Sequence, residues 1–295
     1  GRDLDELYES AYNRDFEAVP LGISTSISLD VEVDSVTTAN VLVYLEGSDP
    51  ELKDEYVIFT AHHDHLGIGP PNDQGDTIYN GAMDNASGVG QILAMAKAYK
   101  ALPEGHRRSI MFLFVGAEEQ GLLGSKWYAA NPTVQPGKIA ANLNYDGGNL
   151  HGRTHDIVYI GFGKTSIDEL VVKYAGEQGR VVKPDQFADR GYFYRSDQFS
   201  FARIGVPAMY LDPGTDFVDR PPEWGRQVVE EYTSNHYHQP SDEYDPNWNL
   251  EGMIEDAKVG FWTGLAIANS DEMPTWNEGD EFEAARLESL RAIED

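Results

Sequence analysis

Apolar and polar positions follow two different rhythms along this chain. At residues 23–33 (ISTSISLDVEV) apolar and polar residues alternate, a pattern typical of a half-buried strand. From residue 87 onward, segments with a helical repeat of apolar residues alternate with short apolar runs bounded by turn-forming residues. Strands are therefore predicted at residues 23–33, 40–47, 56–61, 109–117, 138–146, 156–160 and 206–212, and helices at residues 4–16, 87–102, 119–131, 165–179, 249–270 and 277–295.

The order of these elements predicts the fold class. Strands that alternate with helices favour an α/β sheet with helices on both faces, a three-layer α/β/α arrangement. The helix at residues 4–16 precedes this alternation, so residues 1–20 are interpreted as a lead-in helix, which could be the stub of an upstream region. The last helix, at residues 277–295, is highly charged and is expected at the periphery.

Composition narrows the classes of function. The chain has 295 residues, 50 acidic against 22 basic side chains, a net charge of −28 and no cysteine. This acidity argues against a nucleic-acid partner, which would require basic patches. The lack of cysteine excludes disulfides, thiolate zinc sites and cysteine nucleophiles. No apolar stretch reaches the roughly 18 residues of a membrane span, and the acidic start GRDLDELYES does not resemble a signal peptide.

Metal-binding residue types follow the predicted strands. His62 comes directly after one strand, Glu118 and Glu119 after another, and Asp146 ends a third. In open α/β sheets the ligand-binding crevice lies beyond the carboxyl ends of the strands. Asp84 lies in a glycine-rich loop before a helix, and His236 and His238 precede a Pro-containing turn. Imidazole and carboxylate ligands without sulfur suit zinc, and also manganese or cobalt.

Six motifs, taken together, give the chain a resemblance to a known family. They are AHHDHLG, NGAMDNASGV, FVGAEEQGLLGS, NYDG, YRSDQFSFARIGVPA and YHQPSDE, in that order between about residues 40 and 270. As a set they resemble the co-catalytic dizinc aminopeptidase family, which includes leucyl-type bacterial aminopeptidases, glutamate carboxypeptidase and the non-catalytic transferrin-receptor ectodomain. The resemblance implies a zinc peptidase catalytic domain over residues 21–295, with a central mixed, mostly parallel sheet. It also implies a peptide substrate and favours a periplasmic or secreted protein.

The resemblance implies a role for each residue of the site. Asp84 would bridge two zinc ions, which cobalt or manganese could replace, and its peptide bond to Asn85 would be cis. His62 and Asp146 would complete one metal site, and Glu119 and His238 the other. Glu118 would be the general base, Asp64 would accept the other ring N–H of His62, and Tyr194 or Tyr237 would donate to the oxyanion, with Tyr194 preferred.

Two histidines of the first motif, His63 and His65, are not assigned as metal ligands. Side chains two residues apart on an extended chain share a face, so Asp64 lies on the side of His62 while His63 points away. His63 is therefore interpreted as structural, and His65 is left as a residue that could line the site. His236 competes with His238, although the QPSD that follows favours His238.

Several alternatives stay open. Gln239 and Gln198 depart from the threonine and the histidine that are frequent in the family at these positions. A carboxypeptidase or dipeptidase would need arginines for a terminal carboxylate, and several arginines lie close together in sequence: Arg190, Arg195, Arg203, Arg220 and Arg226. A non-catalytic receptor-like module is disfavoured because all five ligands and the base are present, and a one-zinc glutaminyl cyclase is disfavoured by the complete two-metal set.

Overall fold

The computed structural model describes residues 3–18, 20, 22–33 and 35–293. The chain divides into two compact units, Gly1–Thr37 and Thr38–Asp295. We describe each unit by itself. The sequence-based division into residues 1–20 and 21–295 stays a prediction about domain organisation.

The first unit contains helix α1 (Leu4–Ala11), which confirms the predicted lead-in helix over eight residues. The Asp3 side chain caps it by accepting from the backbone N–H of Asp5 over 2.9 Å. The strand predicted at residues 23–33 is wrong, since these residues form no regular element. A strand needs a neighbour to pair its backbone groups, and among the described residues 22–33 no backbone hydrogen bond is made. The alternating apolar side chains are exposed instead; Ile27, for example, is 76% exposed.

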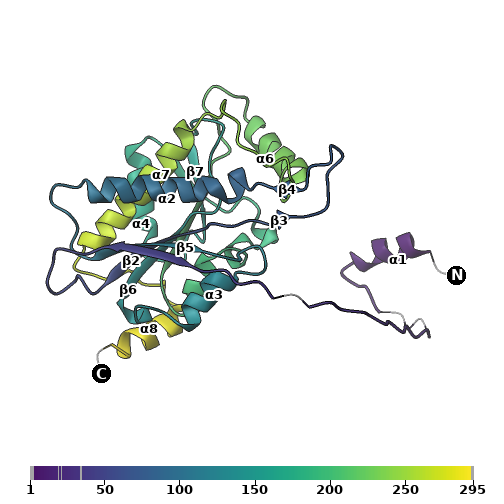
Figure 1. Cartoon of the computed structure of the whole chain (residues 1–295), viewed down its shortest axis with the longest axis horizontal. Helices are drawn as coiled ribbons and strands as arrows, with labels where there is room; N and C mark the ends of the chain where they lie inside the picture. The colour runs from purple at the N-terminus through teal and green to yellow at the C-terminus, as the bar shows by residue number, and fades with distance from the viewer. Residues whose placement is uncertain (1–2, 19, 21, 34, 294–295) are drawn as a thin grey trace. The chain divides into compact units, whose positions relative to one another are not determined.

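Within the described residues of the second unit, a seven-stranded sheet has the order β1-β5-β2-β6-β9-β7-β8; Figure 1 labels its strands β2, β5, β6 and β7. Strand β1 is antiparallel to β5 and β7 is antiparallel to β9, while the other neighbours are parallel. The predicted mixed, mostly parallel sheet is therefore confirmed. The strands are β1 (Val41–Leu45), β2 (Tyr56–His62), β5 (Ser109–Val115), β6 (Ile139–Asn144), β7 (Asp156–Ile160), β8 (Val181–Pro184) and β9 (Ala208–Pro213), and a separate hairpin pairs β3 (Gly67–Ile68) with β4 (Ile78–Tyr79).

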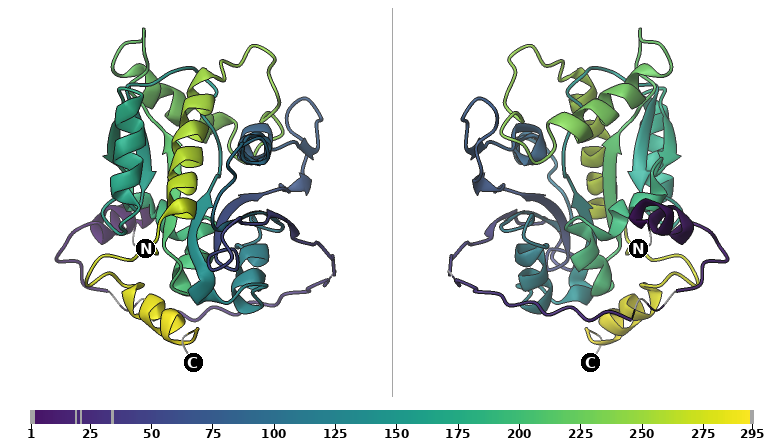
Figure 2. Two further views of the ribbon diagram at one scale, coloured as in Figure 1. Left: turned by 90° about the vertical axis from the view of Figure 1, so that its left-hand side faces the viewer. Right: turned by 90° about the vertical axis from the view of Figure 1, so that its right-hand side faces the viewer.

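Helices cover both faces of this sheet, as predicted (Figures 1 and 2). Alternate residues of β2 pack on opposite faces: Phe59 belongs to the core under α2 (Gly88–Lys100), α4 (Asp168–Glu177) and α7 (Glu251–Asn269). Ile58 belongs to the core under α3 (Leu123–Ala130) and α5 (Gln198–Arg203). The remaining helices are α6 (Trp224–Asn235), α8 (Glu283–Arg291), a π-helical turn η1 (Ala82–Ser87) and the 3₁₀ turns η2 (Pro136–Lys138), η3 (Ala188–Arg190) and η4 (Tyr192–Tyr194).

The four parallel strands in the middle of the sheet position the candidate site. Because β5, β2, β6 and β9 run in the same direction, their carboxyl ends meet at one edge. The segments that carry His62, Glu118 and Asp146 all leave the sheet at this edge. The predicted positions of these residues at three strand ends are confirmed: His62 is the last residue of β2, and Glu118 and Asp146 follow β5 and β6.

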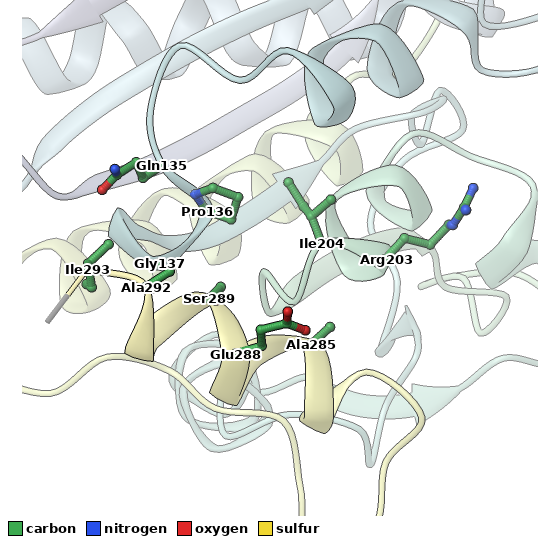
Figure 3. A pocket seen from close by; sticks show the side chains of 10 residues that line it. All are labelled: Gln135, Pro136, Gly137, Arg203, Ile204, Ala285, Glu288, Ser289, Ala292 and Ile293. Atoms are coloured by element: carbon green, nitrogen blue, oxygen red, sulfur yellow. The ribbon is translucent and has the colours of Figure 1, made fainter. Parts of the chain in front are cut away.

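A cavity of about 310 Å³ lies elsewhere in this unit, between α8 and η2 (Figure 3). Pro136 and Ile204 line it together with residues of α8 such as Ala285 and Ser289. Turn η2 leads directly into the amino end of β6, whereas Asp146 follows its carboxyl end. The cavity therefore lies at the edge of the sheet opposite the candidate site.

Among the described residues, no helix is both long and apolar enough to cross a membrane.

Candidate metal centre

Asp84 lies at the centre of a cluster of acids and histidines. Its Oδ1 is 3.1 Å from His62 Nε2, and its Oδ2 is 3.4 Å from His238 Nε2. His62 Nε2 also lies 3.1 Å from Asp146 Oδ1, and His238 Nε2 lies 2.9 Å from Glu119 Oε2. The structure thus brings together all five residues that the sequence proposed as ligands. The two oxygens of Asp84 face two different histidines.

Local structure fixes how Asp84 is presented. The peptide bond between Asp84 and Asn85 is cis, as the sequence comparison implied. The buried Asp242 carboxylate accepts from the backbone N–H groups of Met83 and Asp84, over 2.9 and 3.0 Å. The Asn85 side chain accepts from the N–H of Gly147, the residue after Asp146, over 2.9 Å. Neither Asp242 nor Asn85 was predicted to belong to the site, although both lie within the motifs that carry the resemblance.

The orientation of His62 is also fixed. Its Nδ1–H donates to the backbone carbonyl oxygen of Asp64 over 2.8 Å, so Nε2 faces the carboxylates of Asp84 and Asp146. The acceptor is therefore the Asp64 carbonyl and not the predicted carboxylate. That carboxylate instead accepts from the backbone N–H of Ala117 over 2.5 Å, because the chain has already left the extended β2 conformation. Asp64 thereby links the segment of His62 to the loop that carries Glu118.

Glu118 is buried, with 8% of its surface exposed, beside the cluster. Burial, together with the nearby carboxylates of Asp146 and Asp197, raises the pKa of Glu118 to about 9. His62 and Glu118 also contribute atoms within 4.8 Å of one another and of Glu119. A buried carboxyl group whose pKa is raised beside possible ligands is a candidate general base.

The pKa values of the histidines reflect the excess of negative charge. The carboxylates of Asp84 and Glu119, 3.4 and 2.9 Å from Nε2, raise the pKa of His238 to about 9. Burial alone would lower the pKa of His62, but Asp146 and Asp84 raise it well above its usual value. Both shifts favour the protonated imidazole, because positive charge beside the carboxylates is stabilised.

Several atoms of the cluster show that a metal fits these residues. Within the described part of the chain, His238 Nε2 and Glu119 Oε1 are buried without a hydrogen bond of good geometry. Buried polar atoms are rarely left unpaired, and each such case calls for an explanation. Nitrogen and oxygen ligands without sulfur are the set that zinc accepts. The orphaned atoms and the donor types therefore agree with a metal centre.

The structure separates the competing tyrosines and histidines. The Tyr237 ring stacks on the His238 ring with centroids 3.8 Å apart. The Tyr194 hydroxyl instead donates to Glu281 over 2.7 Å, so the structure does not bring the preferred Tyr194 together with the cluster. His236 contacts Ser241 and Glu231 rather than the cluster.

The two remaining histidines of AHHDHLG differ sharply. His63 faces the carbonyl oxygen of Ala39 and is exposed, in agreement with a structural role. The side chain of His65 is only 5% exposed, and its Nδ1 lies 2.7 Å from Glu119 Oε1. His65 therefore does line the cluster, a position that the sequence analysis left open.

The fold and the site agree with what comparison with known proteins shows. The family model of peptidase family M28 matches residues 40–261, and the chain belongs to this family. A probable leucine aminopeptidase 2 from Aspergillus oryzae is 29% identical over 85% of this chain and 50% of its own length. A probable lipoprotein aminopeptidase from Mycobacterium tuberculosis is 28% identical over 82% of this chain and 48% of its own length. The chain spans about half the length of these relatives.

Solved structures show the same fold. A zinc aminopeptidase from Bacillus subtilis has a TM-score of 0.58 and 20% identity, covering 83% of this chain and 52% of that one. An aminopeptidase from Aneurinibacillus has a TM-score of 0.56 and 21% identity, covering 79% of this chain and 49% of that one. The α/β arrangement described above is therefore the fold of known aminopeptidases.

Proposed function

We propose that this protein is a zinc-dependent aminopeptidase that holds two ions and removes N-terminal residues from peptides. The observation that carries the proposal is the Asp84 carboxylate, with one oxygen at His62 and the other at His238. A carboxylate between two histidines is suited to bridge two cations. The names of the relatives, leucine aminopeptidase and zinc aminopeptidase, support the same reaction.

Each ion would have its own set of residues. His62, Asp146 and one oxygen of Asp84 would hold the first ion; His238, Glu119 and the other oxygen of Asp84 would hold the second. When bound, zinc ions supply Lewis acidity that lowers the pKa of water and polarises a scissile carbonyl. Cobalt or manganese could substitute because the donors are imidazole and carboxylate.

The protein's own groups would carry the proton and orient the ligands. Glu118 would take a proton from the attacking water and deliver it to the leaving amine. Ser196 Oγ donates to Asp146 Oδ2 over 2.5 Å, which leaves Oδ1 directed at His62. The Tyr237 hydroxyl would donate to the oxygen that becomes negative in the transition state, since its ring already stacks on His238.

The contacts of the arginines argue against a carboxypeptidase. Arg190 donates to the Tyr192 hydroxyl and Arg226 pairs with Glu230. Arg220 stacks on Trp224, and Arg203 lines the cavity of Figure 3 at the opposite edge of the sheet. Arg195 stacks on Tyr192 and directly precedes Ser196, which donates to Asp146. Arg195 is therefore the arginine that keeps the carboxypeptidase alternative open.

Hydrolysis of blocked dipeptides tests the proposal. The zinc-loaded protein should release the first residue from peptides with a free amino group and a blocked carboxyl group. A chelator should abolish this activity, and added zinc should restore it. Cleavage restricted to N-acetylated peptides with a free carboxyl group would establish the carboxypeptidase instead. Two bound zinc ions without hydrolysis of either series would indicate a non-catalytic module.

A further inference from the structure

His65 lies beside Glu119 and His238, but none of the roles assigned so far involves it. Its side chain is 5% exposed, and its ring packs edge-on against His238 with centroids 5.5 Å apart. Gly81 makes room for it: at a backbone φ of +63°, a Cβ on Gly81 would come within 2.7 Å of the His65 ring. The chain thus closes around this imidazole from the Asp84 side.

The nitrogen atoms of His65 are not satisfied by the protein. Nδ1 lies 2.7 Å from Glu119 Oε1, yet the two atoms do not form a hydrogen bond. Among the described residues, neither ring nitrogen of His65 has a hydrogen-bond partner, and Glu119 Oε1 accepts no hydrogen bond. A histidine with a purely structural role would pair at least one nitrogen when it is this deeply buried.

At 2.7 Å, with no hydrogen bond between them, His65 Nδ1 and Glu119 Oε1 are close enough to bind one common cation. A nitrogen of His65 and one carboxylate oxygen each from Asp84 and Glu119 lie within 4.8 Å of one another. Ligand atoms about 2.0–2.2 Å from one zinc ion are at most about 4.4 Å apart. The three donors therefore fit one ion with only a small adjustment of their side chains.

We propose that His65 is an additional ligand of the ion held by Asp84, Glu119 and His238; the inference rests on the proposed two-metal function. The two metal sites are then unequal. The site with His65 has four protein side chains, as in closed zinc sites, while the site of His62 has three and keeps an open position. The four-residue site binds zinc more tightly and fills first.

Zinc titration of two neighbouring variants tests this inference. Calorimetry on the metal-free wild type should resolve two sites of different affinity. His65→Ala should weaken the tighter site by at least about 10- to 100-fold, the loss known even for residues that only support a ligand. Free imidazole should recover part of the affinity by filling the space left in the variant. His63→Ala is the matched control, because that ring is exposed and faces the Ala39 carbonyl, and it should titrate like the wild type.

His65→Asn separates ligation from positioning. Its amide nitrogen occupies nearly the place of Nδ1 and can donate to Glu119, but an amide is a poor zinc ligand. We expect His65→Asn to lose affinity as His65→Ala does, and the cobalt-loaded variants to show an altered absorption spectrum. If His65→Asn keeps the wild-type affinity and spectrum, His65 only positions Glu119 and the inference is overturned.

The remaining outcomes distinguish this inference from the proposed function. If the wild type binds two zinc ions and His65→Ala binds both equally well, His65 is not a ligand, although the two-metal function stands. If the wild type binds no zinc, both proposals fall. Circular dichroism and thermal unfolding of the metal-free proteins show whether each variant is folded before its affinity is compared.

Discussion

Strands β2 and β5 carry buried charges at both ends, and the two ends are built differently. At the amino end, Arg108 is 1% exposed, and its Nε donates to Glu55 over 2.7 Å. The same guanidinium donates to the carbonyl oxygens of Ile267 and Ser270. At the carboxyl end, two carboxylates and two histidines surround Asp84, and several buried atoms of this cluster have no hydrogen-bond partner among the described residues.

The difference separates a structural use of buried charge from a functional one. A buried cation with a carboxylate and two carbonyls is satisfied within the protein, so it holds neighbouring segments together. The carboxyl end has more negative charge than its partners neutralise, and the pKa of Glu118 is raised to about 9 there by burial and by Asp146 and Asp197. This excess of negative charge destabilises the folded protein until cations bind, as we expect of a metal centre.

The largest effect should come from separating the adjacent acids of the carboxyl end. Glu118→Gln keeps the shape but removes the base, so kcat should fall by roughly 10²- to 10⁴-fold while zinc content stays near that of the wild type. Glu119→Gln removes a ligand, so zinc affinity should fall first, and excess zinc should restore part of the activity by mass action. Zinc content and kcat are measured on both variants. The opposite pattern would exchange the two roles, and activity in both would contradict the two-metal proposal.

At the amino end, Arg108→Met should affect stability without affecting zinc. Removing one partner of a buried ion pair leaves the other charge unpaired, which lowers the free energy of unfolding. We expect a fall of about 3 kcal/mol, the lower end for a buried pair, because the Glu55 side chain is 22% exposed to water. Urea unfolding gives this value, and metal analysis of the folded variant should still find wild-type zinc content. The double variant with Glu55→Met serves as the control and should recover part of the loss. A fall in zinc content of folded Arg108→Met would show that the two ends are coupled.

A matched pair of tyrosine variants sharpens the comparison at the carboxyl end. Tyr237→Phe keeps the ring stacked on His238 but removes the hydroxyl, so kcat should fall by about 10²-fold with little change in zinc affinity. Tyr194→Phe removes only a hydroxyl bound to Glu281 and should leave kcat unchanged. Steady-state kinetics on both variants decides which tyrosine acts in the reaction; a loss confined to Tyr194→Phe would reverse our assignment.

The sequence predicted the site better than the loops around it. His62 and Asp146 follow strands whose direction is set by the fold, so their meeting at one edge could be predicted. The position of His238 needed the family motif, because its loop has no periodic pattern. The hydroxyl of Tyr194 binds Glu281, 87 residues away, and local sequence holds no signal for such a contact. His65 stayed open because the alternation of side chains ends where β2 ends, at His62.

The same physical limit explains the strand that was predicted at residues 23–33 and is not formed. These residues have the alternation of a strand, but alternation does not supply a pairing partner. The tail from residue 277 was expected at the periphery because of its charge, and most of helix α8 is indeed exposed or half-buried. Arg286 is the exception: it is buried and donates to the carbonyl oxygen of Ile139 over 2.9 Å. A buried arginine that binds backbone carbonyls looks like a surface residue in the sequence.

The smallest effect we predict is a pH dependence that the two ends should not share. In the metal-free protein the pKa of His238 is raised to about 9 by Asp84 and Glu119. The stability this histidine contributes is fully present below its unfolded pKa of about 6.5 and is lost as pH rises through about 9. The raised pKa of Glu118 acts in the same direction, because its carboxyl group keeps a proton in the folded state that the unfolded chain loses. The melting temperature of the metal-free protein should therefore fall between about pH 6.5 and 9.

Zinc should reverse this trend, because a histidine ligand must be neutral to bind a metal. At pH 7, zinc binding should release protons from the cluster, and zinc affinity should rise as pH approaches 9. Calorimetry in buffers of different ionisation enthalpy counts the protons released. The Arg108→Met variant is the control: it removes a guanidinium that does not titrate in this range, so it should lower the melting temperature equally at every pH. A melting temperature of the metal-free wild type that stays constant from pH 6.5 to 9 would show that His238 and Glu118 are not held in the protonated state by their neighbours.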